Sequence, residues 1–322
     1  MKTNVFKYPA LAIVCTLFII SCGRQIDPKS DGYYKTLKGI YYSPNNNWFE
    51  FGLTYLDDAD SKSFIVLGQS YAKDKNHAYY KSKIIKEADV ETFYVDTTGL
   101  AKDKNNVFVS DYYTSECRPA ICDIDIMTAE YFVHNQNGQD HLWLRDKKYV
   151  YLNEKRIDVD RNTFKEFHEW YIDKNWIYFL YSDSEKEEYK LLCIDSIQNP
   201  LETISGTAFY LRNGKDIIYL GKIAMHNIDI KSIKALDFTT CIVNDLFLFD
   251  GNVRLKDTID VATLQTVGCF LKDKNHIYYG AEILNGIDAA TFRQTAEYCY
   301  KDKNGNYEFD FSAKSSSPLK RK

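Results

Sequence analysis

The sequence predicts an all-β protein assembled from repeated units, and three observations support this fold class. The chain of 322 residues is 45% hydrophobic and 27% charged, a composition that folds rather than stays disordered. It contains 26 Tyr, 19 Phe and 4 Trp, and aromatic side chains favour strands because they pack well on a pleated surface. The third observation is a short polar motif that returns along the chain about every 30 residues.

The charge balance disfavours a role in binding DNA or RNA. Lysine and arginine number 41 against 45 aspartates and glutamates, so the formal net charge is −4. No basic run is long enough to form an electrostatic footprint for nucleic acid.

The first residues have the order of a bacterial lipoprotein signal. Two lysines precede an apolar run over residues 10–20, shorter than the ~20 residues that a spanning helix needs. Ile19-Ile20-Ser21-Cys22 then resembles a lipobox, in which the cysteine is lipidated and the signal cleaved. We expect residues 1–21 to be removed, Cys22 to anchor the protein to a membrane of the cell envelope, and residues 22–31 to form a tether. The alternatives are a plain signal peptide or an uncleaved anchor.

An Asp-Lys-Asn motif followed by aromatic residues organises the rest of the chain. Asp and Asn tolerate positive φ and hydrogen-bond their own backbone, so each copy predicts a turn that leads into a strand. Arg145-Asp146-Lys147-Lys148 is a degenerate copy. The predicted structural turn residues are Asp74 and Asn76, Asp103 and Asn105, Asp173 and Asn175, Asp273 and Asn275, and Asp302 and Asn304.

A second signature, Asp-x-x-Thr or Asp-x-x-Ser, is followed by an apolar residue. Its copies are spaced by 29, 36, 35, 69, 31 and 28 residues, and the longest spacing contains a decayed copy at Asp195. We therefore expect about eight repeats of 28–36 residues over 57–311, a β cap at 32–56 and a disordered tail at 312–322. The copies start at Asp60, Asp89, Asp125, Asp160, Asp229, Asp260 and Asp288.

Asp-Lys-Asn followed by a Tyr-Tyr pair, with Asp-x-x-Thr-Phe between copies, resembles the bacterial DKNYY repeat family. The resemblance extends over about residues 55–310 and is strongest at 72–109 and 270–304. It implies a repetitive, secreted or surface protein and brings no catalytic residues to transfer.

Each repeat is expected to contain about three short strands. An aromatic strand, a polar turn and an apolar return form a hairpin, as in residues 78–85 and 277–283. The Asp-x-x-Thr-Phe piece fits one helical or 3₁₀ turn with Asp as its N-cap, so Phe93, Phe164 and Phe292 are expected to be buried.

A single repeat cannot bury its own apolar face, so neighbouring repeats must stack. A linear stack gives a β-solenoid-like or superhelical array, whereas a closed ring gives a β-propeller. Propeller blades have four strands and about 40–45 residues, so shorter repeats with three strands favour the open array.

The cysteines allow one local disulfide and predict no metal site. Cys117 and Cys122 flank a proline-containing loop that can bring their thiols together in an exported protein, with free thiols as the alternative. Cys241 and Cys269 each lie four residues before an Asp, which predicts one buried column. No zinc spacing or complete calcium loop occurs, and we expect no metal and no cofactor.

The motifs predict a function in binding rather than in catalysis. No His-Glu-x-x-His, Gly-x-Ser-x-Gly or Gly-rich phosphate loop occurs, so no catalytic residues are assigned. We expect a lipid-anchored structural module or one that presents a surface to an unknown protein. A carbohydrate-binding lipoprotein whose Tyr and Trp rings stack on sugars is the alternative, and an enzyme without a recognisable motif is the third hypothesis.

Overall fold

The computed structural model describes residues 23–27, 32–44, 52–68, 70–111, 116–132, 143–183, 188–244, 246–254, 259–280, 282–311 and 318–321. The predicted signal and the lipidation site Cys22 lie outside these residues. No helix among the described residues is long and apolar enough to cross a membrane.

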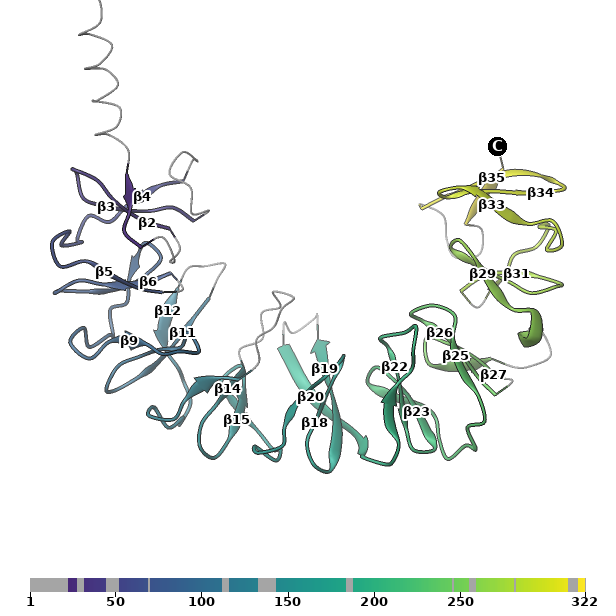
Figure 1. Cartoon of the computed structure of the whole chain (residues 1–322), viewed down its shortest axis with the longest axis horizontal. Coiled ribbons are helices and arrows are strands. Elements are labelled where there is room, and N and C mark those ends of the chain that lie inside the picture. Colours follow the sequence, from purple (N-terminus) through teal and green to yellow (C-terminus); the bar gives the residue numbers. More distant parts are fainter. Residues whose placement is uncertain are drawn as a thin grey trace, which may run out of the picture. The chain divides into compact units, whose positions relative to one another are not determined.

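Within the described residues the chain forms nine four-stranded antiparallel sheets, which we number 1 to 9 in chain order (Figure 1). In every sheet the four strands pair in the order in which they occur in the chain, and no sheet closes on itself. The predicted all-β repeat fold is therefore confirmed.

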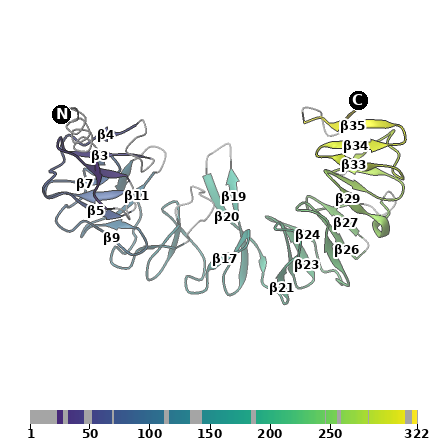
Figure 2. The same ribbon diagram turned by 45° about the horizontal axis from the view of Figure 1, so that its top comes forward.

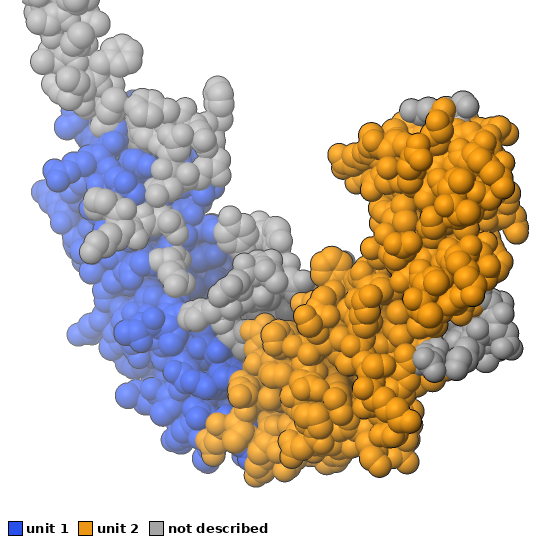
Figure 3. All heavy atoms as spheres, turned by 45° about the vertical axis from the view of Figure 1, so that its right-hand side comes forward, with its two compact units in different colours: residues 1–161 blue, residues 162–322 orange. Residues whose placement is uncertain are grey.

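The chain divides into two compact units, residues 1–161 and 162–322 (Figure 3). The first unit contains sheets 1 to 4. Their strands are β1 (Arg24–Gln25), β2 (Tyr33–Lys35), β3 (Ile40–Tyr42) and β4 (Thr54–Tyr55); β5 (Ile65–Gly68), β6 (Tyr71–Lys73), β7 (Ala78–Tyr80) and β8 (Lys83–Ile84); β9 (Tyr94–Val95), β10 (Ala101–Lys102), β11 (Val107–Ser110) and β12 (Cys117–Pro119); and β13 (Glu130–Tyr131), β14 (Trp143–Arg145), β15 (Val150–Leu152) and β16 (Lys155–Ile157).

The second unit contains sheets 5 to 9 and one 3₁₀ turn, Val261–Thr263. Its strands are β17 (Lys165–Phe167), β18 (Trp170–Ile172), β19 (Trp176–Asp183) and β20 (Glu188–Ser196); β21 (Leu201–Thr203), β22 (Tyr210–Asn213), β23 (Asp216–Tyr219) and β24 (Lys222–Met225); β25 (Ile233–Ala235), β26 (Thr240–Val243), β27 (Leu246–Phe249) and β28 (Asn252–Arg254); β29 (Gln265–Val267), β30 (Phe270–Lys272), β31 (Ile277–Tyr279) and β32 (Glu282–Ile283); and β33 (Arg293–Ala296), β34 (Cys299–Asp302), β35 (Gly305–Phe309) and β36 (Leu319–Arg321).

Within each unit the hydrophobic core lies between consecutive sheets. Tyr33 of sheet 1 packs in one cluster with Phe64 and Tyr79 of sheet 2. In the second unit, Phe270 of sheet 8 packs with Phe292 of sheet 9. Each sheet thus buries its aromatic second and third strands against a neighbour, as stacked repeats must.

Four strands per repeat correct the prediction of three. The missed strand directly follows the buried apolar residue of the Asp-x-x-Thr signature, as in β5, β17 and β33. In β5, β17 and β33 no side chain of this strand is buried, so the strand carries no apolar alternation by which it could be recognised. Because each repeat supplies four strands, the strand-count argument against propeller-like blades is wrong.

Both ends of the repeat region also differ from the prediction. β2, β3 and β4, which lie in the expected cap, belong to a complete four-stranded sheet. β1 lies in the expected tether and pairs with β2. Residues 319–321, in the expected disordered tail, form β36 and pair with β35. The described part of the chain thus contains nine sheets where we expected eight repeats.

Sheet 9 lacks two of the apolar residues through which sheet 8 packs on its neighbour. In sheet 8, Phe270 and Ile277 are fully buried and pack in the cluster shared with sheet 9. In sheet 9 the corresponding positions are those just before the paired residues Tyr300 and Tyr307. Cys299 and Asn306 occupy them. Cys299 is half-buried and Asn306 is exposed, so sheet 9 lacks the apolar pair through which sheet 8 packs on its neighbour.

Strands β19 and β20 form a two-stranded ribbon that extends beyond the rest of sheet 5 (Figure 2). β18 pairs with β19 only at Ile177 and Tyr178, whereas β20 pairs with β19 as far as Asp183. The distal half of β19 therefore has a described partner on one side only.

Candidate functional site

The carboxylate of Asp74 is the centre of the first Asp-Lys-Asn turn, between β6 and β7. Its Oδ1 accepts the backbone N–H groups of Asn76 and His77 at 2.7 and 2.8 Å. Its Oδ2 accepts the backbone N–H of Asp60 at 2.7 Å and the hydroxyl of Tyr79 at 2.9 Å. Asp74 is only 4% exposed, and a buried carboxylate is tolerated when its oxygens accept such hydrogen bonds. The turn is thereby joined to the Asp-x-x-Ser segment that precedes β5.

The same arrangement recurs in five further sheets. One carboxylate oxygen accepts two backbone N–H groups of its turn in each. In four of them the carboxylate also accepts the N–H of the Asp that starts the preceding Asp-x-x-Thr segment. A tyrosine five residues after the turn Asp donates its hydroxyl in four. The carboxylates belong to Asp103, Asp146, Asp173, Asp273 and Asp302.

We call the turn and the Asp-x-x-Thr segment joined to it a lock. The lysine after the turn Asp also takes part in this lock. Lys104 donates its backbone N–H to Thr92 Oγ1 at 3.2 Å, and its Nζ lies 2.7 Å from Asp89 Oδ2. The two sequence signatures are thus two halves of one structure, which sequence reasoning missed. Their regular co-occurrence was the signal that could have revealed it. Equivalent ion pairs are Lys75 with Asp60, Lys147 with Asp125, Lys274 with Asp260 and Lys303 with Asp288.

The lysine before the turn Asp reaches the following sheet. Lys73 Nζ donates to the carbonyl oxygens of Val90 and Phe93, at 3.1 and 2.7 Å, in the segment that leads into sheet 3. Each such lysine therefore links one repeat to the next. Equivalent contacts join Lys102 to the carbonyl of Ala129 and Lys272 to the carbonyl of Phe292.

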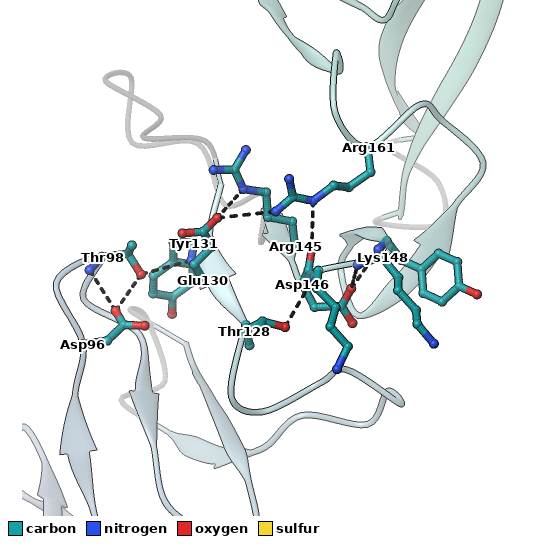
Figure 4. A network of polar contacts seen from close by, with 12 residues as sticks. Asp96, Thr98, Thr128, Glu130, Tyr131, Arg145, Asp146, Lys148 and Arg161 are labelled. Atoms are coloured by element: carbon teal, nitrogen blue, oxygen red, sulfur yellow. Dashed lines mark hydrogen bonds and ion pairs between the residues drawn. The ribbon is translucent and has the colours of Figure 1, made fainter.

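Sheet 4 replaces this lysine by Arg145, and the contact changes (Figure 4). Arg145 Nε donates to Glu130 Oε1 at 2.5 Å, within its own sheet. Arg161 Nη2 lies 3.9 Å from the same oxygen, and its Nε donates to the carbonyl of Asp146 at 2.9 Å. A carboxylate shared by two arginines thus takes the place of the carbonyl acceptors to which Lys73, Lys102 and Lys272 donate.

The repeats without the motif keep the lock with an asparagine. Asn213 is fully buried, and its side-chain oxygen accepts the backbone N–H of Gln198 at 2.7 Å. Its Nδ2 donates to Asp195 Oδ2 at 2.9 Å, so the decayed Asp195 segment occupies the usual place. In sheet 7, Asn244 accepts the N–H of Lys231 at 2.8 Å in the same manner.

Aromatic residues at the start of second strands also reach the next sheet. The Tyr33 hydroxyl lies 2.7 Å from the carbonyl oxygens of Ser70 and Lys81 in sheet 2. Trp170 Nε1 donates to the Leu220 carbonyl of sheet 6 at 2.7 Å. These rings are therefore architectural, because their polar ends bind neighbouring turns.

The electrostatics of the lock favour ionised carboxylates. Burial would raise the pKa of Asp273, but hydrogen bonds from Tyr278 and backbone N–H groups outweigh it, and the pKa lies below its usual value. The same opposition lowers the pKa of Asp74, Asp146 and Asp302. In the Asp-x-x-Thr segments, hydrogen bonding to the partner lysines lowers the pKa of Asp60, Asp89 and Asp125 to about 2.

The structure assigns the predicted turn chemistry to the aspartates. Asn76, Asn105, Asn175, Asn275 and Asn304 are exposed, and none of the five has a positive φ. In the contacts described above, four of these asparagines contribute to the lock only through a backbone N–H group; the exception is Asn304. The positive φ that asparagine tolerates is therefore not used at these five positions.

Of the two alternatives for Cys117 and Cys122, a local disulfide or free thiols, the structure has free thiols. Cys117 packs against the core between sheets 2 and 3, 3.9 Å from the Tyr71 hydroxyl, and burial raises its pKa to about 12. Cys122 packs against the core between sheets 3 and 4. The two cysteines thus pack against different cores.

The predicted cysteine column is wrong. Cys241 is buried in β26, whereas Cys269 is exposed in the turn before β30. The turn after β30 begins at Asp273, but the turn after β26 begins at Asn244, one residue before the aspartate used in the count. Cys241 and Cys269 therefore lie at positions that differ by one residue relative to their turns. A shift of one residue moves a strand side chain to the opposite face.

Among the described residues, no group of three or more His, Cys, Asp or Glu side chains is placed to hold a metal ion. The lock carboxylates bind N–H groups, hydroxyls and lysines instead.

Comparison with known proteins identifies one family. Residues 12–115 and 143–310 match the model of the DKNYY family. No curated protein and no solved structure matches the chain.

Proposed function

The chain belongs to the DKNYY family, and from this membership and the structure of its repeats we propose that it is a lipid-anchored protein of the bacterial cell envelope that presents a binding surface. The proposal rests on one observation: the repeated polar residues form the locks and the contacts that join one sheet to the next. Their repeated chemistry is used for architecture, as in other repeat proteins that bind partners along an extended face.

Variable residues on this constant framework support a role in recognition. The third position after each turn Asp lies beside the lock, at the start of the third strand or just before it. It varies among the repeats, although two of them share histidine, and in sheet 5 it is Trp176, which is 44% exposed. Aromatic side chains are enriched at protein interfaces. The residues at this position are His77, Asn106, Tyr149, Trp176, His276 and Gly305.

The binding role is tested by capture in the native cell. A photo-crosslinking residue in place of Trp176 is expected to capture a defined partner, because the ring is exposed next to the lock. The same residue in place of the exposed Lys165, on the edge of the same sheet, is the matched control. Equal capture at both positions, or none at either, contradicts a specific surface around Trp176.

Carbohydrate binding remains the second candidate, and one observation favours it. Phe311 is 72% exposed and Tyr298 is 38% exposed, with ring centroids 4.8 Å apart at the end of sheet 9. Their planes meet at 70°, so they offer a corner rather than one flat stacking surface. Capture of a polysaccharide instead of a protein would favour this candidate.

Membrane anchoring is proposed from Ile19-Ile20-Ser21-Cys22. Two or more acyl chains anchor a protein stably, because each buried CH₂ contributes about 0.8 kcal/mol. Cys22→Ser is therefore expected to abolish incorporation of a fatty-acid analogue and to release the protein or leave it uncleaved. Metabolic labelling and membrane fractionation check this. A wild-type protein that takes up no label and fractionates as soluble contradicts the anchor.

A further inference from the structure

The distal half of β19 is an open sheet edge with little protection. Phe179 lies at the base of the ribbon. Its ring is so close to Gly221 of sheet 6 that a side chain at this glycine would collide with it. Beyond it, Leu180–Asp183 pairs with β20 on one side, and no described strand pairs on the other. Unpaired backbone N–H and C=O groups at such an edge can bind another strand.

Other edges in the described part of the chain are protected. Outside sheet 5, the first and fourth strands are two to four residues long. β20 itself carries Glu188, Lys190 and Asp195 and has a register shift near its base. By contrast, Leu180, Tyr181 and Ser182 include no charge and no proline, the residues by which proteins usually block edge pairing.

We propose that this edge pairs with the same edge of a second copy of the chain. Antiparallel pairing centred on Tyr181 places Leu180 opposite Ser182 of the second copy, and Phe179 opposite Asp183. No two like charges face each other in this register. Tyr181, which is 47% exposed, meets its own counterpart, and aromatic cross-strand pairs stabilise a sheet.

Charge at the ribbon tip favours the antiparallel arrangement and the two-fold symmetry that it implies. At this end of the ribbon β19 ends at Asp183 and β20 begins at Glu188, two acidic residues that lie opposite each other. Parallel pairing would bring two such tips together, whereas antiparallel pairing directs them to opposite ends. A two-fold contact in which one patch meets itself is the commonest form of homodimer.

The contact is small, so we expect a weak association. A pairing of about five residues buries much less than the roughly 1,000 Å² of a stable interface. The edge can therefore act between copies held at high local concentration without causing permanent dimers. This inference does not depend on the partner or on the anchor proposed above.

The test is disulfide trapping of the full chain in its native cell. Opposite residues of antiparallel strands have Cα atoms about 4.5–5.5 Å apart, within the range that a disulfide spans. Tyr181→Cys, treated with diamide as the oxidant that removes two thiol hydrogens, is expected to give a dimer on a non-reducing gel. Ile223→Cys is the matched control, because Ile223 is 39% exposed on the short edge strand β24. We expect at least about fivefold more dimer from Tyr181→Cys.

Adding Leu180→Lys to Tyr181→Cys places a charge on the edge and is expected to reduce the dimer to the control level. Circular dichroism of both variants shows whether each remains folded. Equal trapping of the two cysteine variants, or trapping that survives Leu180→Lys, would overturn the proposal. A crosslink to a protein of different mass would show that the edge binds a foreign strand and would overturn it as well.

Discussion

Asp273→Ala is expected to lower the free energy of unfolding by about 3–5 kcal/mol. Asp273 is 1% exposed and accepts hydrogen bonds from Asn275, His276, Asp260 and Tyr278. The substitution leaves these four donors without their acceptor, and each unsatisfied buried donor costs about 1–3 kcal/mol before local relaxation. Chemical denaturation at pH 7 measures the loss.

Asn275→Ala is the matched control for this turn. The Asn275 side chain is exposed and its contribution to the lock is a backbone N–H, so we expect a change within about 0.5 kcal/mol. Similar losses for Asp273→Ala and Asn275→Ala would contradict the lock.

The dependence on pH gives an independent readout of Asp273→Ala. The folded pKa of Asp273 is lowered, so its stabilisation is present above the unfolded pKa of about 3.9 and is lost as pH falls through the folded value. The difference between wild type and variant should therefore shrink as the pH falls below about 4. A difference that stays constant over this range would place the loss in something other than the carboxylate.

Phe292→Ala is expected to cost about 3–5 kcal/mol, the usual range for a packed phenylalanine truncated in a core. Phe292 is 2% exposed, stacks on Tyr300 with centroids 5.4 Å apart, and meets Phe270 edge to face at 5.7 Å. Thermal or chemical denaturation measures the loss. An unchanged stability would mean that the ring contributes little to the core.

Hydrogen exchange on Phe292→Ala reports where the damage spreads. Repeats contact their neighbours, so residues around 260–310 should lose protection before those around 60–110. The exposed Phe311→Ala is the matched control and should leave both regions unchanged. Uniform loss of protection would contradict repeat-by-repeat coupling.

Local patterns of apolar and turn-forming residues were enough to predict part of the fold. The hairpins after the turns appear as β7–β8, β15–β16 and β31–β32. The predicted plugs Phe93, Phe164 and Phe292 are all buried. Such residues can be predicted because burial and turn geometry restrict the choice of side chain locally.

The rest depends on contacts that no local pattern encodes. β33 was missed because all four of its side chains are exposed and its pairing with β34 uses the backbone. The bond from Asp288 to Asp302 joins residues 14 apart, and its geometry becomes visible only when the sheet is folded. Asn213 could not be recognised as a lock residue, since its neighbours lack the motif.

The difference between sheets 8 and 9 has a consequence for how the chain can evolve. A duplicated copy of a repeat such as that of sheet 3 carries its own lock and a lysine, Lys102, that reaches the next sheet, so a copy inserted beside it meets compatible neighbours. A copy placed against the outward face of sheet 9 would instead meet Cys299 and Asn306, where sheet 8 presents Phe270 and Ile277. We therefore expect duplication of such interior repeats to be tolerated better than insertion of a repeat against this face of sheet 9.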